Sequence, residues 1–125
     1  MPAPTTSREA LLQCIELWTE IANREVDSII GKEFLSIELF DYDPLFGCPC
    51  CEYASAKTGT TGAGLCGACP VDAWRGLDRG CLVDKTSYEK WDCPSSPQDA
   101  KEGALAVAHL AQESLDALEE TKEST

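Results

Sequence analysis

Cys48-Pro49-Cys50-Cys51 and Cys66-Gly67-Ala68-Cys69 are the two stretches on which the fold of this 125-residue chain depends. Each contains a Cys-x-x-Cys pair, and 14 residues lie between the pairs, giving the pattern C-x2-C-x14-C-x2-C. This spacing is at the edge of the range that is typical of a tetrahedral zinc site. Because a closed shell of four thiolates leaves no position for a substrate, the pattern predicts a structural metal rather than catalytic chemistry.

We expect one Zn²⁺ per chain, bound by the two Cys-x-x-Cys pairs: Cys48, Cys51, Cys66 and Cys69. Adjacent Cys50 and Cys51 point apart, whereas a Cys-x-x-Cys turn closes around a metal, so Cys48 and Cys51 form the better first pair. Cys81 or Cys50 could replace one ligand, and Cys93 lies further along the chain. An iron–sulfur cluster or a redox dithiol is the alternative, although no further Cys-Pro cluster signature accompanies these cysteines.

Length and composition predict one domain over residues 1–125 with a modest core that a metal would help to stabilise. No segment approaches 18 consecutive apolar residues, so we expect no membrane span. The start, residues 1–7, has neither a basic region nor an apolar stretch and does not resemble a signal peptide. We therefore expect a cytoplasmic protein whose eight cysteines are metal ligands or free thiols, with a secreted disulfide scaffold as the alternative.

The net charge of -12 argues against a protein that binds nucleic acid over a broad surface, because phosphate repels an acidic chain. The charge is uneven along the sequence. Residues 1–47 carry nine acidic and three basic side chains, and residues 94–125 carry seven and two. Residues 48–93 are nearly balanced, with six and five. The acid therefore lies in the regions on either side of the cysteine-rich middle.

The N-terminal region, residues 6–40, is predicted to be helical. Thr6-Ser7-Arg8-Glu9 is a capping box. Apolar residues then recur at helical spacing: Leu11, Cys14, Ile15, Trp18, Ile21 and Ala22. We interpret Cys14 as a small buried hydrophobe rather than a ligand. For Arg24 to Phe40 we favour a second helix broken at Gly31, although residues 35–40 also alternate like a strand. The apolar residues that fit this helix are Val26, Ile29, Ile30, Phe34 and Ile37.

The predicted fold class is small and mainly α. An irregular, zinc-bound middle, residues 41–94, is expected to pack between the N- and C-terminal helices, with short strands near the cysteine pairs as an option. Ser96-Pro97-Gln98-Asp99 predicts the start of the C-terminal helix, which we place in residues 95–118, before a frayed tail at 119–125. An alanine-rich apolar stripe follows this start: Ala100, Ala104, Val107, Ala108, Ala111, Leu115 and Leu118.

Enzymatic activity is not expected from these residues. The chain has one histidine, His109, which we place on or near the polar border of the last helix. Without a second histidine, the chain offers few residues from which the common acid–base and nucleophile–histidine arrangements could form. The His-x-Glu signature of the zinc deaminases, which also use Cys-x-x-Cys ligands, does not occur in the sequence.

The chain resembles a family of small cysteine-rich proteins encoded by tailed bacteriophages. The residues that carry the resemblance fall within 15–93: Leu17-Trp18, Cys48-Pro49-x-Cys51-Glu52-Tyr53-Ala54, Cys66-x-x-Cys69-Pro70, Trp74, Cys81 and Tyr88-x-x-Trp91. Cys50 departs from the apolar residue usual inside the first turn. The resemblance implies a cysteine-bound metal and a phage accessory protein acting in the infected bacterial host. It supplies no catalytic residues.

We therefore expect a zinc-stabilised, non-enzymatic protein whose acidic helices engage a host or phage protein, for example as an inhibitor or mimic acting on a host nucleic-acid enzyme. The outer helices could also bury their apolar faces in a homodimer. Aromatic residues of the middle are expected to pack around the metal centre. The alternative is direct nucleic-acid binding through a local basic and aromatic patch: Arg75, Arg79, Lys85, Lys90, Trp74 and Trp91.

Overall fold

The computed structural model describes residues 4–26, 29–42, 49–59, 70–71, 88–92 and 94–123. Most of these residues lie in five helices: α1 (Ser7–Asn23), α2 (Ile29–Phe40), α3 (Pro49–Thr58), α4 (Tyr88–Asp92) and α5 (Pro97–Glu123). No strand occurs in the part of the chain that the structure describes. The small, mainly helical class predicted from the sequence is therefore confirmed.

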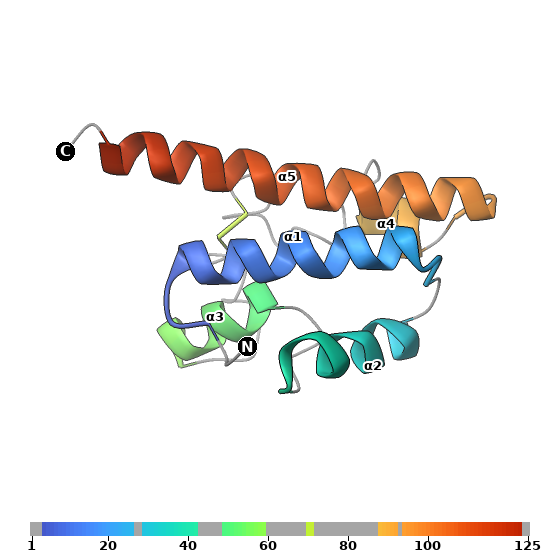
Figure 1. Ribbon diagram of the computed structural model, residues 1–125, viewed down its shortest axis with the longest axis horizontal. Coiled ribbons are helices and arrows are strands. Elements are labelled where there is room, and N and C mark those ends of the chain that lie inside the picture. The colour runs from blue at the N-terminus through green and yellow to red at the C-terminus, as the bar shows by residue number, and fades with distance from the viewer. Residues whose placement is uncertain are drawn as a thin grey trace.

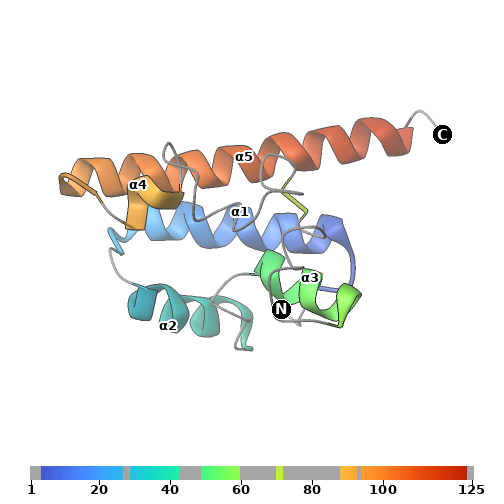
Figure 2. The same ribbon diagram turned by 180° about the vertical axis from the view of Figure 1, so that it is seen from behind.

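α1 is the central element of the molecule. α5 runs antiparallel along one side of it, while α2 and α3 lie on the other side (Figures 1 and 2). The short α4 sits beside the N-terminal half of α5. Because neighbours cover α1 on both sides, an unusually wide arc of its surface is buried: Ala10, Leu11, Gln13, Cys14, Leu17, Trp18, Ile21 and Ala22. Cys14 is one of these core residues, as predicted.

The predicted capping signals form as expected at both long helices. The Thr6 hydroxyl accepts the backbone N–H of Glu9 at 3.1 Å, and the Glu9 carboxylate accepts the backbone N–H of Thr5 at 2.9 Å. At α5 the Ser96 hydroxyl accepts the N–H of Asp99 at 3.2 Å. These contacts satisfy N–H groups that have no partner within the helix. The end of α5 was predicted too early, since the helix continues beyond residue 118 to Glu123.

α5 approaches α1 through small side chains. Ala104 and Ala111 are fully buried, and Ala100 and Ala108 are nearly so. Short side chains allow two helix axes to come close together, which explains how α5 lies along α1 directly. The cysteine-rich middle was predicted to lie between these two helices. Of the parts of this middle that the structure describes, α3 packs against α1, and α4 packs against α5 while its Trp91 meets Trp18 of α1; most of the middle lies outside the described residues.

α2 resolves the ambiguity of residues 24–40. The segment is one helix from Ile29 to Phe40 that continues through Gly31, so the predicted break at Gly31 is wrong. It ends where Asp41 adopts φ 60° in the left-handed region, a conformation that aspartate tolerates better than most residues. The next residue, Tyr42, donates its hydroxyl to the buried Gln13 side chain at 2.6 Å, which joins this end of α2 to α1.

Two tryptophans and a lysine form the polar centre of the core. The rings of Trp18 and Trp91 meet edge to face at 4.9 Å between centroids. The Trp91 indole N–H donates to the carbonyl of Val26 at 2.8 Å. Lys32, which is only 1% exposed, places its ammonium 5.5 Å from the Trp18 ring centroid and 5.8 Å from that of Trp91. Cation–π attraction offsets part of the cost of burying this charge.

Candidate functional site

The first cysteine pair lies at the start of a helix. α3 begins at Pro49, a residue that suits the first helical position because its fixed φ is already helical and its missing N–H would be unpaired there. Cys51 is the third residue of α3 and is half-buried. Cys48, its predicted metal-binding partner, lies outside the described residues. Cys51 is therefore presented from a rigid helical turn rather than from an irregular loop.

Cys50 belongs to the protein core. Its side chain has no exposed surface, and its thiol lies 3.8 Å from the backbone carbonyl oxygen of Ala10 on α1. Successive helical residues project about 100° apart, so Cys50 faces α1 while Cys51 faces elsewhere. This agrees with preferring Cys51 to Cys50 as a ligand. If Cys50 replaced one of the four ligands, its side chain would have to leave its buried position beside Ala10.

Two buried residues directly follow the second cysteine pair in the sequence. Cys66, Cys69 and Cys81 lie outside the described residues, as does Cys93. Pro70 and Val71, which directly follow Cys69, are buried, and Val71 belongs to the same hydrophobic core as α1 and α5. Within the described ranges there is no group of three or more His, Cys, Asp or Glu side chains that could hold a metal. The zinc prediction therefore rests on the sequence pattern.

Two members of the alternative nucleic-acid patch are already engaged. The Trp91 ring is 1% exposed and has no free face on which a base could stack. The Lys90 ammonium lies 2.8 Å from the Glu102 carboxylate on α5. The hydrogen bond that the Lys90 ammonium donates to the Glu102 carboxylate raises the pKa of Lys90 and lowers the pKa of Glu102. The other members of this patch lie outside the described residues: Trp74, Arg75, Arg79 and Lys85.

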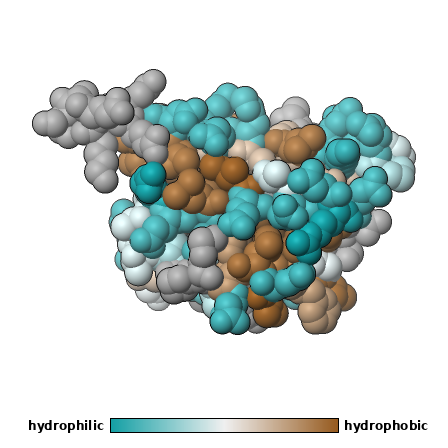
Figure 3. Space-filling model, in the orientation of Figure 1, coloured by the Kyte–Doolittle hydropathy of each residue, from teal (hydrophilic) through white to brown (hydrophobic). Residues whose placement is uncertain are grey.

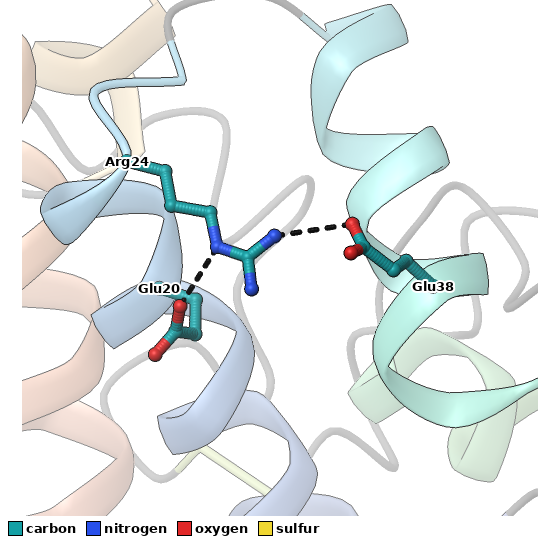
Figure 4. A network of polar contacts seen from close by, with 3 residues as sticks. All are labelled: Glu20, Arg24 and Glu38. Carbon is teal, nitrogen blue, oxygen red and sulfur yellow. Dashed lines mark hydrogen bonds and ion pairs between the residues drawn. The ribbon is translucent and has the colours of Figure 1, made fainter.

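The outer surface of the described helices carries the acid. None of the carboxylate side chains described by the structure is buried. Arg24 links α1 to α2 through ion pairs with Glu20 at 2.9 Å and Glu38 at 3.1 Å, as Figure 4 shows. Its hydrogen bond to Glu20 is the main cause of the raised pKa of Arg24. This cation is therefore already neutralised within the protein.

α5 continues the acidic surface along the opposite side of α1. Its exposed face carries Glu102, Glu113 and Asp116. His109 is exposed, as predicted, and its Nε2 lies 2.9 Å from Glu113. An imidazole in this setting has a carboxylate neighbour, but it faces solvent rather than a cleft that could hold a substrate.

A second feature of the surface is apolar: the sequence predicted that Ile30, Phe34 and Ile37 fit a helix, but not that they are exposed. Ile30, Phe34 and Ile37 on α2 are 66%, 69% and 43% exposed. In Figure 3 an apolar area covers the part of the molecule where α2 lies in Figure 1. The signal was available, since apolar residues of α2 lie on more than one side of the helix and a helix at the protein surface can bury only one of them.

No protein-family model, curated protein or solved structure matches the chain. The resemblance to phage-encoded cysteine-rich proteins therefore stays a prediction, and nothing in the comparisons points to an enzyme. Among the helices described, none is both long enough and apolar enough to cross a lipid bilayer.

Proposed function

We propose that this chain is a zinc-stabilised, non-enzymatic accessory protein that binds a partner protein through its acidic helical surfaces. The observation that carries the proposal is that none of the described carboxylates is buried and that most of them lie on α1, α2 and α5. A rigid acidic surface is complementary to the basic groove of a nucleic-acid-binding protein. The partner class we favour is therefore a host enzyme that acts on nucleic acid, with the chain as its inhibitor or mimic.

The role proposed for zinc is structural. One Zn²⁺ held by Cys48, Cys51, Cys66 and Cys69 would join α3 to the segment that enters the core at Val71. Such a staple would stabilise α3 and the short segment at Val71, which have little surface of their own to bury. The acidic surfaces would then be presented from a body that keeps its shape on binding.

The test is binding to a purified nucleic-acid enzyme. The tagged chain is first used to recover candidates from bacterial lysate at low salt, and each candidate is then purified and titrated directly. We expect a basic, nucleic-acid-binding protein whose affinity for the chain falls steeply as salt is raised, and whose DNA or RNA competes with the chain. A triple variant, Glu102→Gln/Glu113→Gln/Asp116→Asn, should bind more weakly. Recovery of no protein above background would contradict the proposal.

A further inference from the structure

The exposed apolar side chains of α2 form one continuous stripe. Ile30, Phe34 and Ile37 are spaced i, i+4 and i+7, so they lie within about 60° of one another around the helix axis. The stripe spans about two helical turns. The remaining exposed large apolar residues of the described chain are spread over α1 and α5: Leu12, Leu105 and Leu118.

The packing of α2 explains why this stripe lies outside the described core. The opposite face of the helix is already buried against the protein through Lys32, Leu35, Ser36 and Phe40. The core contacts therefore leave the stripe facing outward. An exposed apolar stripe next to polar residues is typical of a surface that docks a helix.

Charge around the stripe indicates what it would accept. Glu33 borders it on one side and Glu38 on the other, since they lie about 60° and 80° from the Ile30 direction. Glu38 also holds the guanidinium of Arg24. A second copy of this chain would bring acid against acid, at a net charge of -12 for each copy. Like charges oppose that contact, whereas a basic border would favour it.

We propose that the Ile30/Phe34/Ile37 stripe of α2 is a docking surface for an amphipathic helix of another protein whose apolar face is bordered by lysine or arginine. This inference rests on the proposed function and specifies the surface and the chemistry of the partner. Apolar contact in the centre supplies affinity, while the carboxylates of Glu33 and Glu38 select partners of opposite charge.

The test uses a synthetic 18-residue helical peptide with a leucine face bordered by lysines, and a control peptide in which glutamates replace the lysines. Binding to the full chain is measured by fluorescence anisotropy in 0.15 M salt. Phe34→Ser and Ile37→Ser should each weaken binding of the lysine peptide about tenfold. The matched control is Leu105→Ser, because Leu105 is 44% exposed on α5 and Ile37 is 43% exposed on α2. It should change the affinity less than twofold.

Nuclear magnetic resonance on the unaltered chain gives a second measurement, with peptide-induced shifts expected on α2 and not on the outer face of α5. Equal binding of both peptides, or equal binding by wild type and Phe34→Ser, would overturn the inference. A dimer of the chain that Phe34→Ser dissociates would show that a second copy covers the stripe. A large loss of melting temperature in Phe34→Ser would show that another part of the chain covers it. If a nucleic-acid enzyme binds wild type and Phe34→Ser equally, the proposed function stands and only this inference fails.

Discussion

The indole of Trp91 connects three parts of the core at once. It meets Trp18 of α1 edge to face, donates its N–H to Val26, and lies beneath the ammonium of Lys32. Each contact depends on the position of the ring rather than on burial alone. Trp91 therefore fixes the short α4 against the junction between α1 and α2.

Replacing Trp91 by phenylalanine should lower the free energy of unfolding by about 2–3 kcal/mol. The variant leaves the carbonyl of Val26 without this donor and opens a small gap beside Trp18. Urea denaturation followed by circular dichroism measures the change. Leu105→Ala, at an exposed position on α5, is the control and should change the stability by less than about 0.5 kcal/mol. Equal stability of Trp91→Phe and wild type would show that this cluster does not contribute as described.

Among single residues, the sequence predicted the burial of those that follow the helical repeat. Trp18 and Cys14 follow the helical repeat and lie in the core. Lys32 could not be predicted, because a lysine at a buried helical position is rare and its stabilising rings come from Trp18 and from Trp91, far away in the sequence. The aromatic character of Trp91 suggested a core residue, but its partners depend on tertiary packing.

The C-terminal end of α1 is closed by a hydrogen-bonded cap. Glu25 adopts φ 55°, and the N–H of Val26 bonds to the carbonyl of Ile21 at 3.0 Å, the arrangement of a Schellman motif. A side chain at this left-handed position is strained, because the Cβ atom crowds the backbone. Glycine is the residue that usually occupies it.

Glu25→Gly should therefore raise the free energy of unfolding by about 0.5–1 kcal/mol. The side chain of Glu25 is exposed, so little packing is lost. Thermal and urea denaturation measure the effect. Glu16→Gly is the control, since it places the same substitution inside the regular part of α1 and should lower stability by about 1 kcal/mol. A loss of stability in Glu25→Gly would contradict the assigned cap.

The ion pair between Lys90 and Glu102 joins α4 to α5 and makes a prediction about pH. Because its pKa is lowered in the folded protein, Glu102 contributes stability that is present above its ordinary pKa of 4.5 and lost as the pH falls through the folded value. In Lys90→Met the pKa of Glu102 should rise toward 4.5. Titration of the side-chain carboxyl by nuclear magnetic resonance measures it. An unchanged pKa of Glu102 would show that the ion pair does not form in solution.

Helix starts were easier to predict than helix continuity. The caps at Thr6 and Ser96 depend on residues within one turn, so the sequence alone reveals them. Gly31 was expected to break α2, but burial of Leu35 and Phe40 offsets the helix cost of one glycine, about 1 kcal/mol. The continuation of α5 to Glu123 was missed because the apolar stripe ends near Leu118.

At the scale of the whole molecule, α1 organises the fold by packing α5 on one side and α2 and α3 on the other. The sequence predicted the helical class but not this order, since it depends on which faces fit together. Net charge predicted an acidic exterior. Helical spacing grouped Ile30, Phe34 and Ile37 but did not predict that they are exposed, because the spacing does not show which face of α2 packs against the protein.

We propose that one zinc ion joins the two cysteine pairs, while the structure places Cys50 in the core. Elemental analysis of protein purified without added metal, with thiol titration alongside, tests it most directly. We expect about one zinc in wild type and in Cys50→Ala, with four thiols protected until a chelator is added, and almost none in Cys51→Ala. Iron with sulfide, no metal at all, or zinc lost from Cys50→Ala but retained in Cys51→Ala would contradict the account.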